Sequence, residues 1–226
     1  MKIESLDHVA LWVADRDTLA DFMTSHLGMH VIDRQDNFTI VGADARRGKL
    51  TLFVAEGPRE AGALERVVLR VGDLERALGD LPSDVEVTRS PEGVAEFTGP
   101  EQLGLGLVEA EGVDYDLDHV VLRARNSKAV FEELADLGFD AQDGRLEVGD
   151  AHLRVAKGAP EDGGRPLLNH FGLRVESAAD HIEEAHRRGL DIADIVDAAN
   201  TYALFVWGPE RLKLEYVEHK ATFSLV

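Results

Sequence analysis

A phrase that recurs four times in this chain carries a histidine at its third position in three copies. The copies are LDHVAL from Leu6, LERVVL from Leu64, LDHVVL from Leu117 and LNHFGL from Leu168, so the third residue is His8, Arg66, His119 or His170. Neutral imidazole is a common ligand of divalent metal ions. The copies start 58, 53 and 51 residues apart, and a repeat of about this length indicates one supersecondary unit used four times. The histidines are therefore comparable, and one can ask which of them share an ion.

An acidic residue near the C-terminus is the candidate partner of these histidines. Glu215 lies in RLKLEYVEHK, a strand-like and largely apolar stretch, on the opposite face from Leu214 and Tyr216. Burying an unpaired carboxylate costs several kcal/mol, and a bound cation would remove that cost. If the third and fourth units pair, His119 and His170 approach each other near this strand. Two imidazoles and one carboxylate form a facial set that leaves open positions on a metal such as Fe(II).

Each of these residues has a plainer interpretation when it is taken singly. A histidine near the start of a strand is usually a core or surface residue, and a glutamate in a strand usually faces solvent. Their joint placement at equivalent points of a repeat favours the metal site. We therefore predict that His119, His170 and Glu215 bind a metal.

The other units lack this full set of residues. The first unit has His8, but its last strand, KLTLFVAE, carries Phe53 where we align Glu215. The second unit has Arg66 in place of the histidine and Gly106 in place of the glutamate. The N-terminal half is therefore interpreted as a scaffold without metal ligands.

The elements that must position these residues follow one order in every unit. Apolar alternation and turn residues predict a strand, a helix and three further strands. In the first unit these are residues 6–13, a helix after Asp15 or Asp17 that stops at Gly28, and strands 29–34, 38–43 and 50–55. The predicted fold is α+β, with four βαβββ units paired into two similar halves, each a curved mixed sheet around a cleft. We expect residues 1–112 (units one and two) and 113–226 (units three and four, the catalytic half) to be these halves, joined at residues 111–116.

The composition excludes several classes of function. The 226 residues include 43 acidic and 24 basic ones, giving a net charge of −19, and no cysteine. Nucleic-acid binding is disfavoured because there is no basic stripe to neutralise phosphates. No apolar run is long enough for a membrane span, and the N-terminus lacks a signal segment, so we expect a cytoplasmic protein. The acidic surface is typical of a protein that works in high salt, where charge repulsion is screened.

On the repeated phrase and the histidine–glutamate set, the chain resembles the vicinal oxygen chelate superfamily, and its two-half layout is similar to that of the type I extradiol ring-cleaving dioxygenases. The resemblance implies a metal on His119, His170 and Glu215, with Fe(II) expected and Mn(II) or another divalent metal as the alternative. It implies a small aromatic vicinal diol and O2 as substrates. It also implies an acid–base histidine in the third unit, which corresponds to His152. Where the family often has a substrate-binding tyrosine this chain has Phe205, with Tyr202 nearby as a weak substitute.

Two other functions stay open at this point. One keeps the metal as a Lewis acid in a glyoxalase-like lyase, isomerase or thiol transferase, which Phe205 favours. The other is a non-enzymatic module that binds a small aromatic ligand. No membrane or nucleic-acid partner is expected, and a homo-oligomer is compatible with the sequence. The remaining histidines are predicted on the surface: His26, His30, His181, His186 and His219.

Overall fold

The computed structural model describes residues 1–57, 59–60, 62–159 and 165–226, and each repeat forms the predicted strand, helix and three strands. The first repeat contains β1 (Ser5–Val13), α1 (Arg16–His26), β2 (His30–Arg34), β3 (Phe38–Gly42) and β4 (Lys49–Val54). The second contains β5 (Leu64–Val71), α2 (Leu74–Gly79), β6 (Thr88–Arg89), β7 (Ala95–Thr98), the 3-10 turn η1 (Pro100–Gln102) and β8 (Gly104–Glu109).

The third and fourth repeats follow the same plan. The third contains β9 (Leu117–Ala124), α3 (Ser127–Asp136), β10 (Asp140–Gln142), β11 (Arg145–Val148) and β12 (Ala151–Lys157). The fourth contains β13 (Leu168–Arg174), α4 (Ala178–Arg188), β14 (Ile192–Asp197), β15 (Thr201–Trp207), η2 (Pro209–Arg211) and β16 (Lys213–His219). None of the described helices is long and apolar enough to cross a membrane. The predicted α+β fold of four βαβββ units in two similar halves is confirmed.

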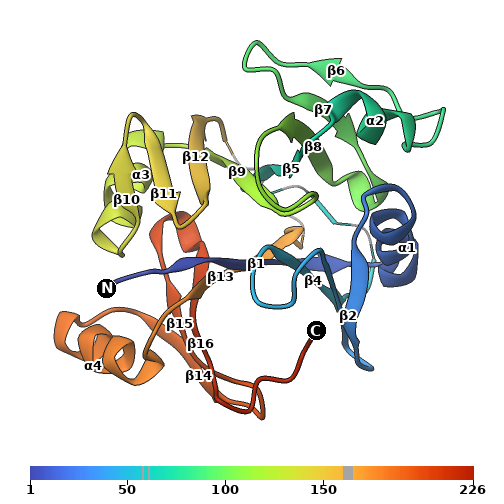
Figure 1. Ribbon diagram of the computed structural model, residues 1–226. Helices are drawn as coiled ribbons and strands as arrows, with labels where there is room; N and C mark the ends of the chain where they lie inside the picture. The colour runs from blue at the N-terminus through green and yellow to red at the C-terminus, as the bar shows by residue number, and fades with distance from the viewer. Residues whose placement is uncertain (58, 61, 160–164) are drawn as a thin grey trace.

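The two halves are not the ones that the order of the repeats suggested. Sheet 1 joins the first and fourth repeats in the order β14-β15-β16-β13-β1-β4-β3-β2, and sheet 2 joins the second and third in the order β10-β11-β12-β9-β5-β8-β7-β6 (Figure 1). The central contacts are the antiparallel pairs β1 with β13 and β5 with β9. The predicted pairing of residues 1–112 with one another, and of 113–226 with one another, is therefore wrong. All four units present a similar first strand, so the repeat alone permits either pairing.

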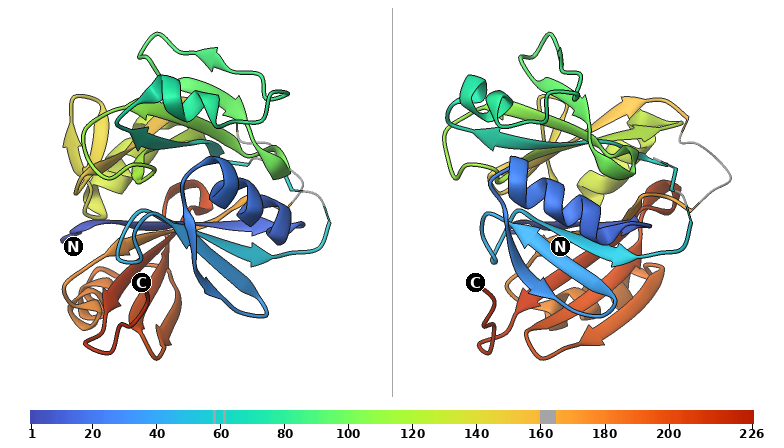
Figure 2. Two further views of the ribbon diagram at one scale, coloured as in Figure 1. Left: turned by 45° about the vertical axis from the view of Figure 1, so that its right-hand side comes forward. Right: turned by 90° about the vertical axis from the view of Figure 1, so that its right-hand side faces the viewer.

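Two glutamates in matching turns tie the sheets together. Glu101 in η1 and Glu210 in η2 both have positive φ, 60° and 47°. The carboxylate of Glu101 accepts hydrogen bonds from the N–H groups of residues 14–15, at the start of α1. Glu210 does the same for residues 125–126, at the start of α3. Each carboxylate thus meets the positive end of a helix from the other sheet, and α1 lies between the two sheets in Figure 2.

Candidate metal centre

A β-bulge occurs at the same place in the first strand of every repeat. In β1, Leu6 pairs with Leu173 and His8 pairs with Gly172, so Asp7 is the extra residue. In β13, β5 and β9 the same irregularity falls on the second residue of the repeated phrase. A bulge re-aims side chains locally. It lets the residue before each histidine turn back toward the imidazole, so two neighbours act as one polar pair.

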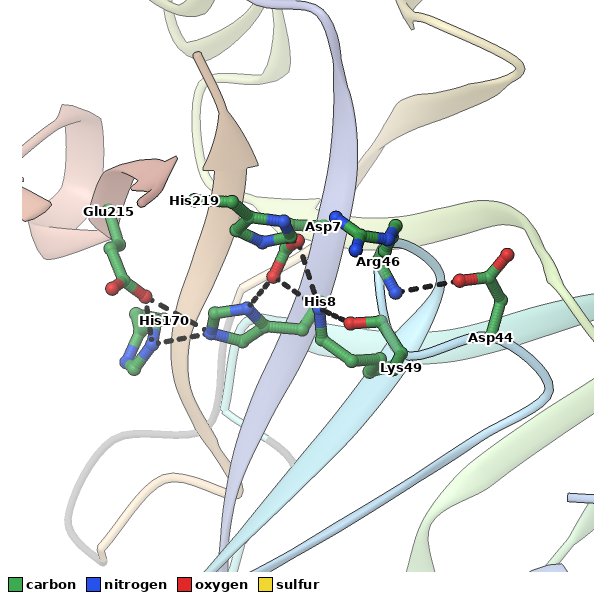
Figure 3. A network of polar contacts seen from close by, with 9 residues as sticks. Asp7, His8, Asp44, Arg46, Lys49, His170, Glu215 and His219 are labelled. Carbon is green, nitrogen blue, oxygen red and sulfur yellow. Dashed lines mark hydrogen bonds and ion pairs between the residues drawn. The ribbon is translucent and has the colours of Figure 1, made fainter. Parts of the chain in front are cut away.

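Three polar atoms converge on the concave face of sheet 1. His8 Nε2 lies 3.0 Å from His170 Nε2 and 3.1 Å from Glu215 Oε2, and His170 Nε2 lies 3.0 Å from the same oxygen. The two imidazole planes are nearly perpendicular, at 79°. The three residues come from β1, β13 and β16 and point toward one another (Figure 3). All three side chains are buried.

Hydrogen bonds behind the two rings direct their Nε2 atoms into this triangle. His8 Nδ1 donates to Asp7 Oδ1 at 2.7 Å, and His170 Nδ1 donates to Asn169 Oδ1 at 3.1 Å. With the protons on Nδ1, both neutral rings present an Nε2 lone pair toward the Glu215 carboxylate. Protons alone cannot satisfy all three contacts. If both Nε2 atoms carry a proton, their two N–H groups point at each other. If only one Nε2 carries a proton, the lone pair of the other Nε2 faces the lone pair of the Glu215 oxygen. A cation at the centre satisfies all three.

The charges around the triangle also favour a positive charge at its centre. Burial opposes charge on His8, but hydrogen bonds to Asp7 and Glu215 outweigh burial and raise its pKa to about 9. Burial likewise opposes ionisation of Glu215, yet the hydrogen bonds from His170 and His8 lower its pKa to about 2. Burial lowers the pKa of His170, which favours its neutral, ligating form. A metal would displace the proton that His8 otherwise carries.

The size of the triangle fits a facial set of ligands. Donors at right angles around an ion, each about 2.1 Å from it, lie roughly 3.0 Å apart, whereas tetrahedral donors at that distance lie roughly 3.4 Å apart. The observed separations of 3.0, 3.0 and 3.1 Å match the first arrangement. The residues present therefore fit a divalent ion that keeps further positions open.

Small residues across the strand pair make room for the two rings. A Cβ on Gly172 would lie 2.2 Å from both Cε1 and Nδ1 of His8, so the His8 ring occupies the space that any side chain there would take. His170 lies opposite Ala10 in the same ladder. The two imidazole rings can therefore lie over these small residues and approach each other across β1 and β13.

Asp7 connects His8 to a buried polar network behind the triangle. Its carboxylate lies 2.9 Å from Lys49 Nζ and 2.7 Å from His219 Nε2 (Figure 3). The His219 side chain is 4 % exposed and stacks on Phe223. The prediction that His219 is a surface residue is wrong, because the C-terminal segment covers it. The prediction for His181 is also wrong, since its ring is buried against Tyr216.

The structure brings together two of the three predicted metal ligands. His170 and Glu215 share the triangle, but His119 lies in sheet 2 and His8 takes its place. This follows directly from the pairing of the first repeat, rather than the third, with the fourth. For the same reason the N-terminal half, expected to be a scaffold, supplies one of the three donors of the candidate site. A signal was present in the sequence: the residue two after the histidine is small in units one and four (Ala10, Gly172) and valine in units two and three (Val68, Val121).

The ladder also corrects the alignment of Glu215 with the first repeat. Gly172 pairs with Glu215 in β13 and β16, and the equivalent Ala10 pairs with Thr51 in β1 and β4. Thr51, not Phe53, therefore stands at the place of Glu215. It offers a hydroxyl where the fourth repeat offers a carboxylate.

The two predicted catalytic residues do not reach the triangle. His152 is in β12 of sheet 2 and stacks on His119, with ring centroids 4.6 Å apart. Tyr202 lies three residues before Phe205 in β15, and it pairs with Glu218 whereas Phe205 pairs with Glu215. Side chains alternate along a strand, so Tyr202 lies on the opposite face of sheet 1. Phe205 does stand beside the site, 5.2 Å from the His170 ring.

A second polar cluster, Asp118, His119 and His152, marks the matching place in sheet 2. Asp118 Oδ1 accepts from His119 Nδ1 at 2.6 Å, as Asp7 does from His8. The rings of His119 and His152 are nearly parallel, at 14°, so their lone pairs run alongside each other instead of meeting. Burial and then the neighbouring His119 lower the pKa of His152 to about 4.

A pocket of about 340 Å³ opens beside the triangle on sheet 1. His170 forms part of its wall, together with four aromatic side chains: Trp12, Phe53, Phe205 and Trp207. Polar groups enter it from Asn169, Asp194 and Lys213. The pocket can hold a flat apolar ring beside His170.

Comparisons with known proteins agree with this architecture. The family model described as the Glyoxalase/Bleomycin resistance protein/Dioxygenase superfamily matches residues 5–206. A comparison with curated proteins finds no match in sequence.

Several solved structures share the fold at low sequence identity. A candidate dioxygenase of Bacillus subtilis subsp. subtilis str. 168 has a TM-score of 0.80 and 15% identity, covering 98% of this chain and 87% of that one. The V278E mutant of glyoxalase I from Zea mays has a TM-score of 0.74 and 17% identity, covering 95% and 92%. The cppA protein of Streptococcus pneumoniae TIGR4 has a TM-score of 0.68 and 15% identity, covering 96% and 100%.

Proposed function

Because the chain belongs to the Glyoxalase/Bleomycin resistance protein/Dioxygenase superfamily, we propose that it is a metal-dependent enzyme whose ion is bound by His8, His170 and Glu215. The observation that carries the proposal is the triangle of two Nε2 atoms and one carboxylate oxygen with edges of 3.0, 3.0 and 3.1 Å. Asp7 and Asn169 hold the two rings in the tautomer that ligates.

The reaction that these residues support best is extradiol-type cleavage of an aromatic vicinal diol by O2, with Fe(II) as the metal and Mn(II) as the alternative. Three protein donors leave three positions on a six-coordinate ion, which is the number that two neighbouring oxygens and dioxygen require. When bound, the metal supplies Lewis acidity and a path for electrons between substrate and O2. The aromatic walls of the pocket beside His170 would hold the ring and exclude water from it.

Oxygen consumption tests this function directly. Protein loaded anaerobically with Fe(II) is given a panel of catechols and then air, while O2 uptake and the yellow ring-cleavage product are followed. Glu215→Gln should abolish both signals and the bound iron, whereas the exposed Glu132→Gln should change neither. Absence of O2 uptake over a broad panel by iron-loaded protein would rule the reaction out.

A Lewis-acid reaction without O2, of the lyase or isomerase kind, is the second candidate. It is favoured by the pocket itself: among its described lining residues, the ionisable groups besides the proposed ligand His170 are Asp194 and Lys213, and His152 lies in the other sheet. Ring cleavage would therefore have to move protons without a dedicated imidazole. Conversion of a substrate without O2 by the protein loaded with zinc or nickel would favour this second candidate.

A further inference from the structure

A lysine in the pocket wall is attracted by two carboxylates, Asp194 and Glu215, without forming an ion pair with either. Lys213 Nζ lies 5.7 Å from the ring centroids of both Phe205 and Trp207. The described part of the chain gives it no ion pair within 4.0 Å. It starts β16, two residues before Glu215 and on the same face, so the two Cα atoms are roughly 7 Å apart along the strand.

In the first repeat, the lysine equivalent to Lys213 forms an ion pair. Lys49 lies beside His8 in the β1–β4 ladder, and Lys213 lies beside His170 because Leu214 pairs with Phe171. Lys49 Nζ is bound to Asp7 at 2.9 Å and to the carbonyl of Ala45 at 2.8 Å. In the fourth repeat the residue equivalent to Asp7 is the neutral Asn169, which also lines the pocket. The lysine is therefore held by an ion pair in the first repeat, whereas in the fourth repeat Asp194 and Glu215 attract it from beyond ion-pair distance.

We propose that Lys213 binds an anionic group of the substrate, and that the substrate class is an aromatic diol or related chelating aromatic that carries a carboxylate. The inference rests on the proposed function for the diol, but the carboxylate is assigned from Lys213, Asn169 and the aromatic walls. A ring between Phe205 and Phe53 would turn its oxygens toward His8, His170 and Glu215 and its acidic substituent toward Lys213.

The negative charge of the whole protein makes a local cation more important for binding an acid. At a net charge of −19 the surface repels anionic ligands at low salt, so an acid needs a local cation to enter. Apolar walls around Lys213 strengthen an ion pair that forms there, because the local dielectric is lower than in water. A hydrogen bond to a charged group of this kind is large enough to change affinity by about tenfold or more.

Binding measurements test the anionic site. Quenching of the fluorescence of Trp12 and Trp207, which line the pocket, reports occupancy. Phenylacetate and phenylethanol form a non-chelating pair that differs in charge, and dihydroxyphenylacetate and ethylcatechol form the chelating pair on Mn(II)-loaded protein without O2. In each pair we expect the acid to bind at least about tenfold more tightly than the neutral compound.

Substitutions test whether Lys213 causes the tighter binding of the acids. Lys213→Met should remove this preference by weakening the binding of phenylacetate much more than that of phenylethanol. Asn169→Asp should remove it for the non-chelating pair by giving Lys213 the partner that Asp7 gives Lys49. The exposed Lys128→Met, which changes the net charge by the same amount as Lys213→Met, should keep the preference. Circular dichroism and thermal unfolding confirm that each variant is folded. Equal affinities within the pairs in the wild type, or a preference that survives in Lys213→Met, would overturn the proposal.

The two compound pairs separate this inference from the proposed function. If the protein binds no metal, the chelating pair loses its advantage over the non-chelating one, but phenylacetate should still bind more tightly than phenylethanol. If the metal and O2 chemistry are present but acids gain nothing, the anionic site is wrong and the function stands.

Discussion

The concave faces of sheet 1 and sheet 2 carry the same strand plan, and they differ in whether their polar residues meet. On sheet 1, His8 and His170 stand at 79° with their Nε2 atoms 3.0 Å apart. On sheet 2, His119 and His152 stack at 14°. Both faces have the bulge and an acidic residue behind a histidine. The bulge and its hydrogen bond orient a ring, but they do not by themselves make a metal site.

The residues opposite the histidines account for the difference. His8 faces Gly172 and His170 faces Ala10, whereas His119 faces Val68 and Arg66 faces Val121. A β-branched side chain fills the space over which a ring could lie. In addition, Arg66 forms an ion pair with Glu96 at 2.9 Å, so its charge is already compensated within sheet 2. Convergence therefore depends on missing volume as much as on ligand type.

Removing one histidine from each face gives the largest expected contrast. His8→Ala should lower divalent-metal affinity by more than the roughly 10–100-fold that loss of an outer hydrogen-bond partner produces, because it removes a proposed direct ligand. His119→Ala should leave affinity unchanged. Titration calorimetry with Mn(II) and metal analysis measure both. A metal lost in His119→Ala and kept in His8→Ala would reverse the assignment of the two faces.

Filling the space at Gly172 should have a smaller effect that still separates the faces. In Gly172→Ala the new Cβ would meet the His8 ring at 2.2 Å, so the ring must move and metal affinity should fall by at least about tenfold. Overpacking should also lower the free energy of unfolding by about 1–3 kcal/mol. Val68→Ala, at the place opposite His119, is the matched control and should bind metal normally. Urea denaturation and calorimetry give both quantities, and normal metal affinity in Gly172→Ala would refute the argument from volume.

The last contrast between the faces is the pH dependence that His152 contributes in sheet 2. The pKa of His152 falls from 6.5 in the unfolded chain to about 4 in the folded protein, so the unfolded state binds more protons between these values. The free energy of unfolding should therefore be undiminished by this group above pH 6.5 and should decrease as pH falls toward 4. NMR titration of His152 measures its pKa, and His152→Gln should lack this part of the acid sensitivity. A pKa near 6.5 would show that the stacked pair is not desolvated.

The local elements could be predicted because their signals are short-range. Ser177 caps α4 by accepting from the N–H of Asp180, and Gly189 ends it in the left-handed conformation, both as the sequence indicates. Asn126 caps α3 by accepting from the N–H of Ala129, and asparagine is a residue type favoured at that position. Glu215 and His170 could be found because an acid in an apolar strand and a histidine in a repeated phrase each need an explanation.

The amino-acid sequence by itself determined the repeated βαβββ unit, its helix ends, and the residue types able to hold a metal, since propensity, periodicity and capping act over a few residues. Only the tertiary structure decided which repeats share a sheet, and with that whether His8 or His119 joins His170 and Glu215. The physical reason is that four similar edge strands can pair in more than one way. The choice depends on how whole faces pack, down to a missing side chain at Gly172 that leaves room for one imidazole.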